Sequence, residues 1–359
     1  MKRFAFSLQE FDDIFQKQVS SYSYNYRRSM RFRGKALYNL IRFSYMEKPT
    51  SEVKPWQVAG YRQMTQDELW ARLSKIGVTL TEVGLLPYAE SCDCPEELID
   101  CLWLEEEPDD RYEEAYLILF ELWRRLLPQK QTLSIFGDEF DHMLYAYDKG
   151  ELLDEELLQK SIADLEDILD QSADAGTEPE EVFQTVSQYC AHEIETFLYD
   201  YIIEQMDEGS ETYASELLDG FYDYVLEKKW FDFLRARLFA IRESQESDTL
   251  FLRLLDQQEE SPDLELCFEI CRFIVNRGDT ALFIKASEMV LIQLELEEDY
   301  QGLLEILAEF YRCLDQESQE KALLDAISKR SAKQQDAAVS APDKKWVYDF
   351  LEEFKRDKL

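Results

Sequence analysis

Three stretches decide the fold prediction: "KKWFDFLRARLFAI" (228–241), "GDTALFIKASEMVL" (278–291) and "EDYQGLLEILAEFY" (298–311). In each, apolar side chains recur with the spacing of one face of an α-helix. Each stretch also looks like the second helix of a helical-hairpin repeat. Together they favour an array of paired helices of the kind that stacks side by side in a solenoid.

The helical spacing extends outward from these stretches along the whole chain. Apolar residues share one helix face at 8–19, 165–169 and 182–190, and the last run predicts a long helix over about 179–207. Strand signals are scarce, because the aromatic runs "LYDYII" and "FYDYVL" each continue a helical stripe. We therefore predict an all-α protein.

Start and stop signals divide this pattern into separate helices. Thr65 to Glu68 and Thr177 to Glu180 have the Ser/Thr-x-x-Glu form of a capping box. Pro95 predicts another start, because proline at the first helical position loses no needed hydrogen-bond donor. Gly77 and Gly150 each follow a periodic run and predict helix ends.

Short connections predict that successive helices pack as antiparallel neighbours. The predicted pairs are 110–127 with 134–148, 153–171 with 179–207, 211–227 with 230–244, 248–258 with 263–277, and 280–297 with 300–315. The three opening stretches start near 229, 278 and 298, at intervals of about 49 and 20, whereas a tetratricopeptide array repeats about every 34 residues. We expect a degenerate α-solenoid or a multi-helix bundle, and we assign no named repeat family.

Composition changes suggest five segments, with a small helical subdomain near the N-terminus. They are a basic, aromatic helical segment (1–48), a small helical subdomain (49–105), an acidic helical-hairpin array (106–330), a flexible linker (331–343) and an amphipathic helix (344–359). The linker lacks an apolar period. Trp346, Phe350 and Phe354 lie on one stripe of the last helix, which therefore has to dock on its own body, on a second copy or on a partner.

Charge is distributed very unevenly. The chain carries 39 Lys and Arg against 76 Asp and Glu, a net charge of −37. Residues 1–90 have a net charge of +5, which leaves −42 for residues 91–359. A field of that sign repels nucleic acids and anionic lipids and attracts basic proteins. We expect direct nucleic-acid binding only through residues 1–48, and no binding to membranes.

One strip runs against the acidity of the chain. Residues 21–35, "SYSYNYRRSMRFRGK", carry five positive charges and no acidic residue. The strip could contact RNA or DNA through arginine and stacked tyrosine, could contact a membrane surface, or could fold back on the acidic body. We favour the fold-back, because it needs no further partner. The candidate contact residues are Arg27, Arg28, Arg31 and Arg33, with Tyr24 and Tyr26 beside them.

The sequence offers little for catalysis. Only two histidines exist, and Glu139 with His142 forms one half of the Glu-x-x-His pattern found in di-metal helical bundles. At His192 the glutamate position holds Tyr189, so the second half is missing, and His142 is more simply an ordinary polar helix residue. Glycine-rich phosphate loops are also missing. We predict that the chain is not an enzyme and holds no cofactor or metal.

Seven cysteines are scattered along the chain. Cys92, Cys94 and Cys101 suggest zinc, but zinc sites commonly combine two Cys-x2–4-Cys pairs and no second pair lies nearby. Cys267 and Cys271 fall on an apolar helical face, where free cysteine behaves as a small hydrophobe. We expect reduced thiols at all five positions.

These observations favour a non-catalytic scaffold, chaperone or regulator that binds a basic protein through an acidic helical surface. One alternative is a metal-binding helical bundle or enzyme that uses His142 and neighbouring carboxylates. A further alternative is an acidic mimic of nucleic acid. The longest apolar run near the N-terminus is about five residues and is followed by Asp12 and Asp13, so we expect a cytoplasmic protein.

Overall fold

The computed structural model describes residues 32–49, 52–103, 110–152, 154–242, 246–258, 260–277, 279–330 and 333–358. The described chain is all-α, as predicted, and contains no β-strand beyond an isolated bridge between Leu296 and Ala338. None of the described helices combines the length and the apolar composition needed to span a bilayer.

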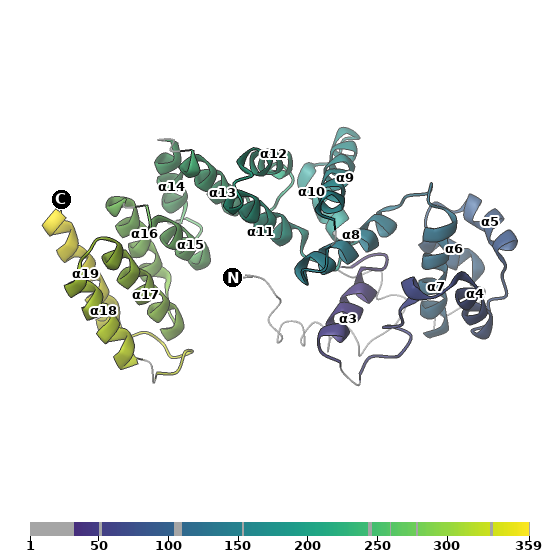
Figure 1. Cartoon of the computed structure of the whole chain (residues 1–359), viewed down its shortest axis with the longest axis horizontal. Coiled ribbons are helices and arrows are strands. Elements are labelled where there is room, and N and C mark those ends of the chain that lie inside the picture. Colours follow the sequence, from purple (N-terminus) through teal and green to yellow (C-terminus); the bar gives the residue numbers. More distant parts are fainter. Residues whose placement is uncertain are drawn as a thin grey trace. The chain divides into compact units, whose positions relative to one another are not determined.

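The described chain divides into two compact units, and Figure 1 labels their helices. The first unit comprises the described residues up to Asp200 together with Asp223–Leu226, and the second comprises Tyr201–Tyr222 and the residues from Glu227 onward. The first contains α3 (Ala36–Glu47), the 3-10 turn η1 (Tyr61–Gln63), α4 (Gln66–Lys75), α5 (Glu82–Ser91), α6 (Pro95–Leu102), α7 (Asp110–Leu126), α8 (Leu133–Asp148), α9 (Glu155–Asp174) and α10 (Pro179–Ser187). The division falls within α11 (Ile194–Asp207). The second contains α12 (Glu211–Phe221), α13 (Lys228–Ile241), α14 (Glu246–Gln257), α15 (Leu264–Ile274), α16 (Thr280–Gln293), α17 (Glu297–Cys313), α18 (Glu317–Arg330) and α19 (Ala341–Lys358).

The predicted helix boundaries around α4 and α6 are confirmed. Thr65 and Glu68 form a complete capping box at the start of α4, and α6 begins at Pro95. Gly77 and Gly150 follow α4 and α8 with φ angles of +99° and +67°, a left-handed conformation that glycine adopts without the penalty of a Cβ atom. Local chemistry therefore fixes these helix ends.

In the first unit, α7 forms the centre of the hydrophobic core. Its middle turns are apolar on all sides, and Tyr116 and Trp123 are fully buried. Helices α4 and α6 and the turn η1 pack around it. Tyr38 of α3 and Ile135 of α8 belong to the same cluster of buried side chains. A shared core thus crosses the segment boundaries that we predicted at residues 48 and 105.

In the second unit, neighbouring helices pack as hairpins (Figure 1). The most extensive contacts join α13 to α14, α15 to α16 and α17 to α18. These pairs are shifted by one helix from the predicted ones, in which α12 paired with α13 and α16 with α17. Helices α13 and α16 bury residues on broad faces, and each contacts a neighbour on both sides. Periodicity alone does not show which neighbour has the larger contact.

The predicted linker belongs to the second unit and is hydrogen-bonded within it. Backbone hydrogen bonds join Val339 N to Glu295 O at 2.9 Å and Glu297 N to Ala337 O at 2.8 Å. The following helix α19 starts at Ala341, three residues earlier than predicted. Backbone hydrogen bonds therefore restrain residues 335–339 of the segment that we expected to be flexible. The sequence does not reveal such bonds, because the segment has no apolar period.

Candidate functional site

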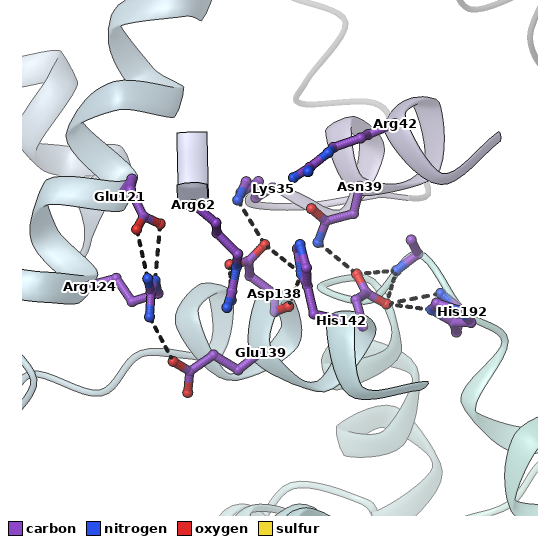
Figure 2. Close-up of polar contacts among 12 residues, drawn as sticks. Lys35, Asn39, Arg42, Arg62, Glu121, Arg124, Asp138, Glu139, His142 and His192 are labelled. Carbon is purple, nitrogen blue, oxygen red and sulfur yellow. Dashed lines mark hydrogen bonds and ion pairs between the residues drawn. The ribbon is translucent and has the colours of Figure 1, made fainter. Parts of the chain in front are cut away.

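A buried ionic cluster surrounds Asp138 on α8 (Figure 2). The Asp138 carboxylate is fully buried and lies 2.9 Å from Lys35 Nζ and 2.7 Å from a terminal guanidinium nitrogen of Arg62. Burial would raise the pKa of this carboxyl, but the two cations outweigh burial and hold the pKa well below its ordinary value. Asp138 is therefore ionised at neutral pH and attaches residue 35 and the turn η1 to α8.

Burial of the cations in this cluster disfavours their charged forms. Burial lowers the pKa of Lys35, and repulsion from Arg62 lowers it further, while attraction to Asp138 opposes both effects. Burial likewise lowers the pKa of Arg42 on α3. Loss of this carboxylate would therefore leave Lys35 and Arg62 without the counter-ion that they contact.

His142 lies one helical turn after Asp138 on α8. Its Nδ1 atom is 2.8 Å from the backbone oxygen of Asp138, and its ring packs edge-on against Phe43 with centroids 5.3 Å apart. Because a carbonyl oxygen only accepts hydrogen bonds, Nδ1 carries the proton and Nε2 is deprotonated. Burial, reinforced by Arg62 and Lys35 and opposed by Asp138, lowers the pKa of His142 to about 4, so the ring is neutral at pH 7.

Asp141, the second buried carboxylate of α8, binds the turn between α10 and α11. It accepts hydrogen bonds from the backbone nitrogens of Ala191 at 2.8 Å and His192 at 3.1 Å, and it lies 3.0 Å from His192 Nδ1. Asn39 of α3 donates a further bond at 2.9 Å. The prediction of one helix over 179–207 is therefore wrong. In residues 188–193 the backbone donors at 191 and 192 bond to Asp141 instead of continuing a helix.

In the described residues, Glu139 and His142 do not form part of a group of metal ligands. Glu139 pairs with Arg124 of α7 at 3.6 Å, and Arg124 also bonds to buried Glu121 at 2.6 Å (Figure 2). Across the residues that the structure describes, no three His, Cys, Asp or Glu side chains are placed to hold a metal ion. The cluster supplies fixed, paired charges, and its geometry suits the anchoring of chain segments.

The predicted strip reaches this region at its C-terminal end. Exposed Arg33 donates its backbone N–H to Gln188 O at the end of α10, at 2.6 Å, and Lys35 pairs with Asp138. The following Gly34 has a φ angle of +56°, and an added Cβ would lie 2.7 Å from Ser134 Cβ. The other strip candidates (Tyr24, Tyr26, Arg27, Arg28 and Arg31) lie outside the described residues.

The three predicted residues of the C-terminal helix lie on α19. Phe350 and Phe354 pack against Tyr311 of α17, each with ring centroids 5.2 Å apart, and Phe354 is buried. Trp346 is 38% exposed and contacts Phe350. Of the three docking sites that we considered for α19, the helix therefore occupies the one on the chain's own body.

An acidic surface adjoins the end of the strip. Residues 151–187, which include α9 and α10, contain twelve carboxylates and one lysine, Lys160, which pairs with Asp164. Within the described part of the chain, no lysine or arginine lies within ion-pair distance of the exposed carboxylates Glu155, Glu156, Asp167, Asp174 and Glu181. Burial, together with the neighbouring Asp170 and Asp167, raises the pKa of Glu166. The negative charge of this surface is therefore crowded and poorly neutralised.

Sequence reasoning missed most of the ionic cluster, including Lys35, Asn39, Arg62, Asp138 and Asp141. A signal existed on α8, where both aspartates lie between Ile135 and Leu144 on the side of the helix that is buried. Charged residues on a buried face require partners, but the sequence does not reveal which distant segment supplies them.

Comparisons of the chain with protein families, with curated proteins and with solved structures found no match.

Proposed function

We propose that the chain is a non-catalytic protein-interaction scaffold that binds a basic protein through the acidic surface of α9 and α10. The observation that carries the proposal is the set of exposed carboxylates on these helices that have no cationic partner among the described residues. Burial is the main cause of the raised pKa of Glu166, and a lysine- or arginine-rich partner would offset the smaller contribution from Asp170 and Asp167. Charge complementarity of this kind promotes fast and selective association.

The fold supports a binding role in a second way. Helical-hairpin arrays present rows of side chains on rigid elements, and the buried clusters around Asp138 and Asp141 hold α3 and the α10–α11 turn in place beside α8. The acidic surface of α9 and α10 thus belongs to a firmly packed unit. A rigid surface loses little conformational entropy when a partner binds.

The test measures binding of a fluorescent lysine- and arginine-rich peptide to the full chain at low and at physiological salt. The test variant combines Glu155→Gln, Glu156→Gln, Asp167→Asn and Asp174→Asn. A control variant removes the same charge from exposed carboxylates elsewhere through Glu298→Gln, Glu305→Gln, Asp325→Asn and Asp349→Asn. We expect affinity to fall at least tenfold in the test variant only, and to fall with salt in the wild type. Equal losses in both variants, or no loss, would reject the assigned surface.

We further propose that residues 21–31 compete within the chain for this acidic surface. In support, the strip ends at Arg33, whose backbone binds the end of α10, and at Lys35, which pairs with Asp138. Deletion of residues 1–31 retains both contacts, whereas deletion to residue 48 would remove buried α3. We expect the shorter deletion to raise peptide affinity in a salt-sensitive manner. Unchanged peptide affinity would contradict the fold-back, and RNA binding by the intact chain that the deletion abolishes would favour a nucleic-acid role.

A further inference from the structure

Two cysteines meet where α5 joins α6. Cys92 directly follows α5 and is buried, whereas Cys101 lies in the last turn of α6 and is exposed. Their Sγ atoms are 3.7 Å apart, with the Cys92 thiol donating to Cys101. Formation of a disulfide requires the sulfurs to approach to about 2.0 Å. The two sulfurs therefore need to move about 1.7 Å closer.

Cys94 does not compete for Cys101. Cys94 directly precedes α6 and lies seven positions before Cys101, which corresponds to a rise of about 10 Å along the helix axis. A disulfide requires Cα atoms within about 7 Å. Burial, followed by the nearby carboxylates of Glu96 and Glu97, also raises the pKa of the Cys94 thiol to about 12, so very little thiolate forms. Cys92 is therefore the partner within reach.

The corner that contains Cys92 is firmly held. Lys130 Nζ donates hydrogen bonds to the backbone oxygens of Ala89 at 2.7 Å and Cys92 at 3.0 Å. The backbone N–H of Asp93 donates to the Glu97 carboxylate at 2.8 Å. These contacts hold the backbone on both sides of the Cys92 side chain, whose sulfur lies 3.7 Å from that of Cys101.

We propose that Cys92 and Cys101 form a redox-sensitive dithiol that low-molecular-weight disulfides such as oxidised glutathione convert into an intramolecular disulfide. The exposed Cys101 thiolate attacks one glutathione sulfur, which breaks the glutathione disulfide and releases one glutathione thiolate. Cys92 loses its proton to solvent and attacks Cys101 Sγ, which expels the second glutathione thiolate. Two protein thiols are thus oxidised by two electrons, and one oxidised glutathione becomes two reduced molecules.

The two thiols have different roles because their surroundings differ. Cys101 is exposed, so it can reach a dissolved disulfide, while Cys92 needs only its neighbour. Burial, followed by the Cys101 thiol, raises the pKa of Cys92. The second step therefore accelerates as pH rises. The product joins the end of α5 to α6 and closes a short loop, which restricts opening of this corner.

The experiment treats the native full chain with oxidised glutathione and analyses it by intact mass and by non-reducing peptide mapping. We expect a product in which Cys92 and Cys101 have together lost two hydrogens, carry no glutathione and are linked to each other, whether or not the exposed Cys313 also acquires a glutathione. Hydrogen exchange in residues 89–101 should slow in this product. Cys94→Ala, the matched control, should react as the wild type does. Cys92→Ala should instead retain one glutathione on Cys101, and Cys101→Ala should give neither product.

Two results would overturn the proposal. One is a wild-type chain that retains glutathione stably at Cys101, because Cys92 would then not resolve the mixed disulfide. The other is a linkage that involves Cys94, or one that forms only after denaturant is added. Since the wild-type measurement does not depend on any substitution, poor folding of a variant leaves the test intact.

Discussion

The Nζ atom of Lys35 lies 2.9 Å from Oδ1 of Asp138, and both side chains are almost completely excluded from solvent. This pair joins the last residue of a basic strip to the middle of α8. In such a setting the attraction within the ion pair offsets a large desolvation cost. Removal of one partner therefore costs more stability than the pair contributes, because the other charge stays buried without a counter-ion.

The first prediction concerns Asp138→Asn. The substitution leaves Lys35 and Arg62 buried without their carboxylate, and we expect a loss of about 3–5 kcal/mol in the free energy of unfolding. Urea denaturation followed by far-UV circular dichroism measures it. Glu139→Gln is the matched control on the same helix, because its pair with Arg124 is partly exposed and worth up to about 1 kcal/mol. Similar losses for both variants would contradict the central role of Asp138.

The second prediction concerns pH. The folded-state pKa of His142 is about 4, below the value of about 6.5 expected when unfolded. Between these values the unfolded chain binds a proton that the folded chain does not, so stability falls as pH drops from 6.5 to 4 and is retained above 6.5. The maximal loss from this group is about 3 kcal/mol.

His142→Gln removes this titration and isolates its contribution. We expect the stability of the variant to depend less steeply on pH than that of the wild type between 4 and 6.5, with the two curves parallel above 7. The depressed pKa of Asp138 also lowers stability in acid, but only below about pH 4 and in both proteins. Parallel curves across the entire range would show that His142 is not protected from protonation.

The third prediction concerns Gly137 on α8. A Cβ added there would lie 2.2 Å from the backbone oxygen of Tyr189, which cannot move without displacing the α10–α11 turn. We expect Gly137→Ala to destabilise the chain by about 1–3 kcal/mol. Gly302→Ala on α17 is the control, because its nearest neighbour would be 3.8 Å away and alanine favours the helix. Thermal unfolding of both variants measures the difference, and a stable Gly137→Ala protein would refute the close approach.

The fourth prediction concerns the attachment of α19. Arg330 bonds to buried Glu297 at 2.5 and 2.6 Å and to Asp343, near the start of α19, at 2.7 Å. We expect Arg330→Gln to cost about 3 kcal/mol and to increase hydrogen exchange in residues 341–356. Arg312→Gln, which removes an exposed pair with Glu309, should leave that exchange unchanged. Unaltered exchange in Arg330→Gln would mean that the apolar contacts of α19 suffice to hold it.

Much of the fold could be predicted because helix formation is local. The capping box at Thr65, the start at Pro95 and the end at Gly77 depend on neighbours within a few residues, and all three are confirmed. The long helix over 179–207 was wrong because its interruption depends on Asp141, which lies fifty residues from Ala191. A periodic pattern carries no information about such a distant acceptor.

The same distinction applies to the candidate site. Sequence reasoning identified the basic strip and the acidity of the body, because charge can be counted along the chain. It treated His142 as an ordinary polar residue, although burial and the cations around Asp138 make its ring neutral at pH 7. Arg62, which pairs with Asp138, is 76 residues away from it in the sequence. Asn39, which bonds to Asp141, is 102 residues away.

The sequence by itself determined that the chain is helical and that its charge is segregated, because helical periodicity and formal charge are properties of nearby residues. Only the tertiary structure decided which helices pair, which carboxylates are buried and that Cys92 faces Cys101. These outcomes depend on desolvation and on contacts between segments distant in sequence. The free energy of a buried charge is set by the partners that the fold brings to it.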